Sequence, residues 1–206
     1  METKGKKARI AVLVSGGGTN LQAILDAERE GIIRSGEVTL VVSDRAGAYA
    51  LKRAEAAGIP AAEILKKECG GQAAFEERLN GKLEENRTEL IVLAGFLSIL
   101  SEAFTRKWEK RILNIHPSLI PSFCGAGYYG LRVHEAALAR GVRVTGATVH
   151  FVNEIPDGGE IVDQKAVAVQ PGDTPETLQR RVMEEAEWVI LPRAIERVLA
   201  ERQAGR

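Results

Sequence analysis

A nearly continuous apolar segment, followed by a glycine turn and a helix, is the feature that most constrains the fold. Residues 8–14 read Ala-Arg-Ile-Ala-Val-Leu-Val, the pattern of a strand buried on both faces of a parallel sheet. The turn Ser15–Asn20, with three consecutive glycines, leads into residues 21–30, where leucine and isoleucine recur at helical spacing. A strand, a turn and a helix in this order predict the start of an α/β fold.

The rest of the chain continues this alternation. Further strands are predicted near residues 38–42, 59–64 and 90–95 and in the segment that ends at His116, and helices near residues 49–57 and 73–85. Residues 143–152 and 161–169 are rich in β-branched residues and are joined by a Gly-rich link, which predicts an antiparallel pair. Thr174 as N-cap and Pro175 at the first helical position predict the start of a long C-terminal helix.

These elements predict a single α/β domain over residues 1–206, in which residues 1–7 form a flexible tail. We expect a mostly parallel, Rossmann-like sheet, with the antiparallel strand pair and the long helix at its C-terminal end. No internal repeat or linker interrupts the sequence.

Charge and cysteine content exclude several classes of protein. The 28 basic and 28 acidic residues cancel, and no basic stripe is apparent, so nucleic acid is not expected as a partner. The only two cysteines, Cys69 and Cys124, make neither a disulfide framework nor a zinc-ligand cluster, which favours a reducing cytoplasm and no metal. No segment approaches the roughly 20 apolar residues that span a membrane.

The glycine turn allows three interpretations. Glycines after a first strand let the backbone approach a ligand, and the next helix offers unpaired N–H groups to a phosphate. A dinucleotide site is an alternative, with Asp44 as the ribose-binding acid, although Leu21 stands where the fingerprint requires a third glycine. The third interpretation is a plain tight turn.

Asn114 and His116 end an apolar strand and are followed at once by Pro117. Residues two apart project from the same face of a strand, with Cα atoms roughly 6–7 Å apart. An amide and an imidazole that converge on one point can stabilise an oxyanion and move a proton. A buried, hydrogen-bonded strand end is the alternative, and a covalent mechanism would require Ser118 or Cys124 as nucleophile.

Asp157 stands in the sequence Pro-Asp-Gly-Gly, which by itself predicts a turn. In the functional interpretation, the loop brings this carboxylate to His116 and keeps the imidazole protonated. The other two histidines fit structural roles. His134 begins a helical stretch and is expected at the surface or near the helix N-terminus, whereas His150 is either a hydrogen-bonded sheet residue or a site-lining one.

Taken together, the motifs resemble those of the folate-dependent formyltransferases, in particular the members that act on glycinamide ribonucleotide. The segments that carry the resemblance occur in the order Ser15–Asn20, Leu93–Phe96, Asn114–Pro121, Thr148–Val152 and Asp157–Gly159, and they extend it over about residues 8–200. The resemblance implies an enzyme of purine biosynthesis that transfers the formyl group of 10-formyltetrahydrofolate, a co-substrate, to the amine of glycinamide ribonucleotide. It also implies that no metal takes part.

The resemblance also implies the residues of the site. Asn114, His116 and Asp157 would be catalytic, and Asp157 would raise the pKa of His116. The ribonucleotide phosphate would be held by Gly18, Thr19 and Asn20, and its ribose by Glu187; the folate would be bound by Leu97, Ser98, Ile99, Leu100, Asn114 and Gln72. We expect small-molecule substrates, a monomer or homodimer, and no nucleic-acid or membrane partner.

Three features depart from the family pattern. Gln72 occupies a position where several members carry an arginine near the folate tail, and residues 126–130 look like an insertion. Glu187 is followed by Trp188 where histidine is common, and one extra residue precedes it.

Other activities are open to a chain with these motifs. Methionyl-tRNA formyltransferase and formyltetrahydrofolate deformylase share the core motifs, but each would need an additional domain, and the length of this chain argues against both. A non-catalytic nucleotide-binding module is the alternative from a different class, and the intact Asn114, His116 and Asp157 argue against it.

Overall fold

A computed structural model describes residues 6–205 and divides the chain into two compact units. Unit 1 extends to Ser98 and resumes at Pro192, and unit 2 comprises Ile99–Leu191. Most of the expected tail at residues 1–7 lies outside the described residues. The expectation of one domain over the whole chain therefore stays a prediction.

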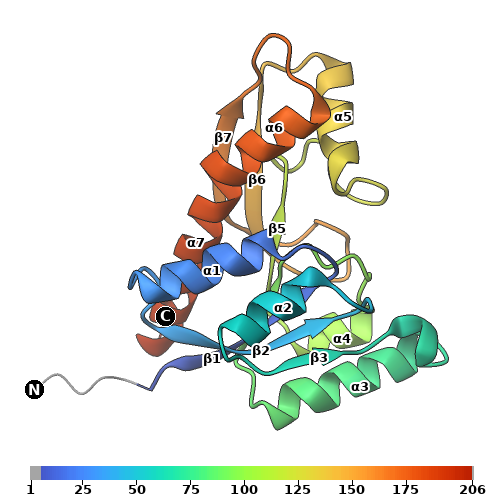
Figure 1. The fold of residues 1–206 in the computed structure, drawn as a ribbon, viewed down its shortest axis with the longest axis vertical. Coiled ribbons are helices and arrows are strands. Elements are labelled where there is room, and N and C mark those ends of the chain that lie inside the picture. Colours follow the sequence, from blue (N-terminus) through green and yellow to red (C-terminus); the bar gives the residue numbers. More distant parts are fainter. Residues whose placement is uncertain (1–5, 206) are drawn as a thin grey trace, which may run out of the picture. The chain divides into compact units, whose positions relative to one another are not determined.

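Unit 1 contains a parallel sheet in the strand order β3-β2-β1-β4. Figure 1 labels β1, β2 and β3 of this sheet. Its strands are β1 (Ala8–Val14), β2 (Gly36–Ser43), β3 (Ala61–Glu63) and β4 (Leu90–Leu93). β1 lies between β2 and β4, and residues 10–13 have no exposed surface, as its continuous apolar sequence predicts. The predicted strands are confirmed.

Three helices of unit 1 connect these strands. They are α1 (Thr19–Arg29), α2 (Tyr49–Ala56) and α3 (Gln72–Glu85), and a short 3₁₀ turn, Lys66–Glu68, precedes α3. α1 and α2 pack on each other, and α2 also packs on β2 and β3. The strand–helix alternation expected from the sequence is confirmed, and the carboxyl ends of β1, β2 and β4 face the same way because these strands are parallel.

Unit 2 contains an antiparallel ladder in the order β5-β6-β7 (Figure 1). The strands are β5 (Ile112–His116), β6 (Val144–Phe151) and β7 (Ile161–Ala168), and the helices α4 (Glu102–Lys107) and α5 (Leu131–Arg140) precede β5 and β6. The expected antiparallel pair is therefore confirmed as β6 and β7. β6 also pairs with β5, and this register places Asn114 opposite His150.

The C-terminal helix begins where the sequence predicts. Thr174 accepts a hydrogen bond from the N–H of Thr177 in a capping box, and Pro175 is the first residue of α6 (Pro175–Val182). A π-helical turn, Met183–Glu187, separates α6 from α7 (Trp188–Gln203). A π turn accommodates one additional residue in a helix, which is compatible with the extra residue expected before Glu187.

Candidate active site

The strand β5 places Asn114 and His116 on one face, as predicted. Its partner β6 places His150 and Thr148 opposite them in the antiparallel register. Cross-strand neighbours point to the same side of a sheet, so all four side chains share one face. Only 4% of His116 and 1% of His150 are exposed. The site therefore lies in a largely dry environment, where electrostatic interactions are strong.

Asp157 lies among these side chains. Its Oδ2 lies 3.5 Å from Nδ1 of His116 and accepts a hydrogen bond of 2.8 Å from the N–H of Gly125. Its Oδ1 lies 3.5 Å from both Nδ2 of Asn114 and Nε2 of His150. The structure thus brings the three expected catalytic residues together, and the predicted contact between Asp157 and His116 is confirmed.

The loop that carries Asp157 is also the turn that its sequence predicts. Asp157 has a φ of 55°, a left-handed conformation that aspartate tolerates better than most residues. At Gly159 an added Cβ would lie 1.7 Å from the carbonyl oxygen of Phe151, so only glycine fits there. The close approach of Gly159 to the end of β6 fixes the loop, and the loop places the Asp157 carboxylate next to His116.

The ring of His116 faces an acceptor at each nitrogen. Nε2 lies 2.9 Å from the carbonyl oxygen of Phe123 and must donate to it, whereas Nδ1 faces Asp157. Burial nevertheless lowers the pKa of His116 from its ordinary 6.5, although the charge of Asp157 and the bond to Phe123 oppose this. The expectation that Asp157 keeps His116 protonated is wrong for the free protein, because desolvation is the larger effect.

His150 belongs to the site, a role that the sequence left open. Its Nδ1 donates to the carbonyl oxygen of Phe151 at 2.8 Å, so Nε2 of the neutral ring is an acceptor. Nδ2 of Asn114 donates to this Nε2 at 3.1 Å. His150 therefore orients the Asn114 amide, and its position opposite Asn114 in the strand register is the signal that identifies it.

The pKa of Asp157 is lowered, so its side chain is an anion at neutral pH. Burial raises this pKa, but the contact with His150, the charge of His116 and the N–H of Gly125 outweigh burial. Asp157 is thus a fixed negative charge next to an imidazole that is neutral but able to gain a proton.

Neither candidate for a covalent nucleophile is activated. The hydroxyl of Ser118 is fully buried and donates to the carbonyl oxygen of Ser122 at 2.5 Å. Burial and the charge of Asp157 raise the pKa of the Cys124 thiol, which keeps the sulfur protonated. The geometry favours direct transfer over a covalent intermediate.

His134 is fully buried on α5, so its expected surface position is wrong. It does lie in the first turn of the helix, as expected, but it belongs to the buried face together with Val133 and Ala137. Neither ring nitrogen has a hydrogen-bond partner among the described residues.

We expect His134 to make the protein sensitive to acid. Burial and the charge of His116 lower its pKa from 6.5 to about 4, so between these values only the unfolded chain binds the proton. The resulting stability is complete above about pH 6.5 and decreases toward pH 4, with a loss of roughly 2 kcal/mol by about pH 5. Urea unfolding at about pH 7.5 and about pH 5 should show a smaller acid loss for His134→Leu than for the unchanged protein. Equal losses would contradict the prediction.

In unit 1, the glycine turn lies against the start of α2. The N–H of Ala50 donates to the carbonyl oxygen of Gly16 at 3.0 Å, and Nε of Arg53 donates to that of Gly17 at 2.9 Å. Gly18 precedes α1 with a φ of 72°, and no side chain caps the helix there. The first N–H groups of α1, from Thr19 and Asn20 onward, are the kind of group that binds phosphate.

Gly18→Ala is expected to destabilise the protein by about 1–3 kcal/mol, because the left-handed backbone is strained for alanine. The new Cβ would also lie 2.6 Å from the Cβ of Ala50. Gly16→Ala is the matched control, since an added Cβ there meets nothing within 4 Å. Thermal and urea unfolding of both variants measure the difference. Equal stability of the two variants would contradict the strained, closely packed backbone at Gly18.

The remaining expected ligand-binding residues are distributed over both units. Gln72 begins α3, and its amide donates to Glu76 at 2.5 Å. Leu97 and Ile99 are 43% and 66% exposed, whereas Leu100 is buried. Glu187 is buried in the π-helical turn. The roles of these residues stay predictions.

Asp44, the acid of the dinucleotide alternative, has another role in this structure. Both of its carboxylate oxygens accept hydrogen bonds, one from Ser15 and one from Ser98. Among residues 6–205, no group of three histidine, cysteine or acidic side chains is placed to hold a metal ion. Within the same range, no helix combines the length and apolarity needed to cross a membrane.

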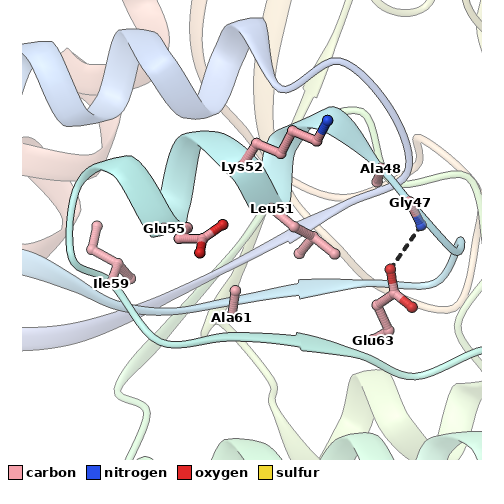
Figure 2. A pocket seen from close by; sticks show the side chains of 8 residues that line it. All are labelled: Gly47, Ala48, Leu51, Lys52, Glu55, Ile59, Ala61 and Glu63. Carbon is pink, nitrogen blue, oxygen red and sulfur yellow. Dashed lines mark hydrogen bonds between the residues drawn. The ribbon is translucent and has the colours of Figure 1, made fainter.

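A separate pocket of about 430 Å³ lies between α2 and β3 (Figure 2). At the edge of this pocket, Oε1 of Glu63 accepts a hydrogen bond from the N–H of Gly47. This bond holds the segment before α2 against the end of β3. The lining residues are Gly47, Ala48, Leu51, Lys52, Glu55, Ile59, Ala61 and Glu63. None of them was predicted as a site residue.

An amide and an imidazole on one strand, in contact with a carboxylate from a loop, define an α/β protein with an acid–base site. Comparison with known proteins identifies the family. Residues 8–195 match the family described as formyl transferase. The chain belongs to the formyl transferase family.

Individual relatives agree with this assignment. The chain is 42% identical over 187 residues to the phosphoribosylglycinamide formyltransferase of Haemophilus influenzae, covering 91% of this chain and 85% of that protein. It resembles the crystal structure of glycinamide ribonucleotide transformylase 1 from Symbiobacterium toebii with a TM-score of 0.90 and 44% identity, covering 98% and 92% of the two chains.

A longer relative shows the same likeness. The chain is 49% identical over 192 residues to a trifunctional purine biosynthetic protein of Gallus gallus. The match covers 93% of this chain but only 18% of that protein.

Proposed function

We propose that this protein transfers the formyl group of 10-formyltetrahydrofolate to the amine of glycinamide ribonucleotide in purine biosynthesis. The observation that carries the proposal is the contact of Asp157 with His116 and Asn114 in a chain of the formyl transferase family. The names of the relatives, which refer to the same acceptor, support it.

In the proposed reaction, the amine nitrogen attacks the formyl carbon directly. The electron pair of the carbonyl bond moves to oxygen, and it returns when the bond between the formyl carbon and the folate nitrogen breaks. Nε2–H of His116 already donates to a carbonyl oxygen, that of Phe123, and a formyl oxygen is the same kind of acceptor. If the formyl oxygen replaces the carbonyl of Phe123 and the carboxylate of Asp157 as acceptors, His116 and the second N–H of Asn114 would stabilise the oxyanion. One such donor contributes about 3–4 kcal/mol.

The reaction also moves a proton from the attacking amine to the leaving folate nitrogen. The neutral ring of His116 can accept this proton at Nδ1 through a water molecule that Asp157 orients, and the charge of Asp157 would stabilise the imidazolium that forms. The proton is then released to the leaving nitrogen through the same water molecule. The revised role of Asp157 is to stabilise a transient charge rather than a permanent one.

The binding roles follow from the resemblance. Gly18, Thr19 and Asn20 would hold the phosphate, and Glu187 the ribose. The segment Leu97–Leu100 would contact the pterin through its main chain, and Gln72 would lie near the folate tail. The start of α1, where no side chain caps the helix, supports the phosphate assignment.

Tetrahydrofolate release, followed after mixing the protein with 10-formyltetrahydrofolate, tests the proposal. We expect release only when glycinamide ribonucleotide is present. Release without the ribonucleotide would identify a formyltetrahydrofolate hydrolase instead. Tight ribonucleotide binding without release would identify a nucleotide-binding module.

A further inference from the structure

The hydrogen bonds of Asp44 join three strand ends of unit 1. Ser15 follows β1, Asp44 follows β2, and the segment Leu97–Ser98 follows β4 by a few residues. Oγ of Ser15 donates to Oδ1 of Asp44, and Oγ of Ser98 donates to Oδ2, each at 2.6 Å. Oγ of Ser15 also accepts the N–H of Leu97 at 2.8 Å. Both oxygens of one carboxylate are therefore used to connect the glycine turn to the segment after β4.

These bonds hold the beginning of the segment Leu97–Leu100, in which only Leu100 is buried. Leu97 is 43% exposed and Ile99 is 66% exposed, so their side chains gain little from burial. The position of the backbone at Leu97 depends instead on Ser15, which is 6% exposed and is itself fixed by Asp44. Hydrogen bonds to a carboxylate are short and strong, so this connection is rigid.

We infer that Asp44 is a positioning residue for the folate, because its hydrogen bonds hold Leu97 and Ser98, the start of the proposed pterin-binding segment Leu97–Leu100. The inference rests on the proposed function, which assigns folate to this segment. Main-chain donors and acceptors recognise a planar heterocycle only if they are held in place before it binds, since ordering the segment during binding would weaken affinity. Asp44 supplies that order without touching the folate.

Three substitutions separate positioning from general stability. Asp44→Ala removes both acceptors, and Ser98→Ala removes one of the two bonds. Asp44→Asn retains one acceptor oxygen, and its NH₂ group can donate to a serine oxygen, so the conservative variant can rebuild both bonds. Glu55→Ala, an exposed acidic residue on α2, is the matched control.

The test measures KM and kcat for each substrate, together with the Kd of 10-formyltetrahydrofolate by calorimetry. We expect Asp44→Ala to raise the folate KM and Kd about tenfold, with kcat changed less than the folate KM, as the loss of charged hydrogen bonds predicts. Ser98→Ala should give a smaller rise in the same direction. Asp44→Asn and Glu55→Ala should stay close to the unchanged protein.

Two results would overturn the inference. One is a folate Kd for Asp44→Ala equal to that of the unchanged protein; the other is an equal rise of both KM values that Asp44→Asn does not rescue. If Asp44→Ala does not fold, Ser98→Ala decides by the same criteria. Failure of the proposed function would differ, because the unchanged protein would then neither bind the folate nor transfer its formyl group.

Discussion

His116→Ala is expected to lower kcat by about a thousandfold. The substitution removes an N–H donor and a proton acceptor together, and each such contribution is worth about 10²-fold or more. His116 is placed for both tasks, since Nε2 donates to a carbonyl oxygen and Nδ1 lies 3.5 Å from the carboxylate of Asp157. Glycinamide ribonucleotide binding should change little, because the proposed phosphate site lies on the glycine turn.

Single-turnover formyl transfer is the appropriate measurement, because it separates chemistry from product release. His134→Gln is the matched control, since His134 is just as buried but has no hydrogen-bond partner among the described residues. The loss of rate in His134→Gln should be at least tenfold smaller than the loss in His116→Ala. A rate near normal for His116→Ala in a folded protein would remove His116 from the catalytic residues.

Asp157→Asn is expected to lower kcat by about 10²- to 10³-fold, a typical loss for proton transfer without its supporting charge. The amide has nearly the same shape, and its oxygen can still accept the N–H of Gly125, so the loop should keep its place. What is lost is the negative charge that stabilises a protonated His116. The depressed pKa of Asp157 means that this charge is present throughout the neutral range.

Glu154→Gln provides the control for Asp157→Asn, because Glu154 is an exposed acid in the same loop. It should retain nearly full kcat. Thermal unfolding should confirm that both variants fold, and the pH dependence of kcat for Asp157→Asn should shift to lower pH, since His116 loses the charge that raises its pKa. Full activity of Asp157→Asn would leave Asp157 as a turn residue only.

The strands and the glycine turn were predictable because their signals are local. The apolar run at residues 8–14, the two-residue spacing of Asn114 and His116 and the Thr174 cap each depend on neighbouring residues. The motif around Asp157 predicts only a turn, whereas the resemblance to the formyltransferases predicts a contact with His116. The structure shows both.

The features that the sequence could not show depend on tertiary packing. The role of His150 follows from the pairing of β5 with β6, because strand register decides which residue lies opposite Asn114. The lowered pKa values of His116 and His134 follow from burial, which a single helix or strand does not determine. The bonds of Asp44 join three separate strand ends, so no short motif contains them.

Transfer of a ¹³C-labelled formyl group, followed by NMR, tests the central claim most directly. The protein is mixed with 10-[¹³C]formyltetrahydrofolate and glycinamide ribonucleotide, and the chemical shift identifies the molecule that carries the label. Direct attack at a site built from Asn114, His116 and Asp157 predicts that the label appears as the formyl amide of the ribonucleotide. Label released as free formate at the same rate with or without the ribonucleotide would contradict it.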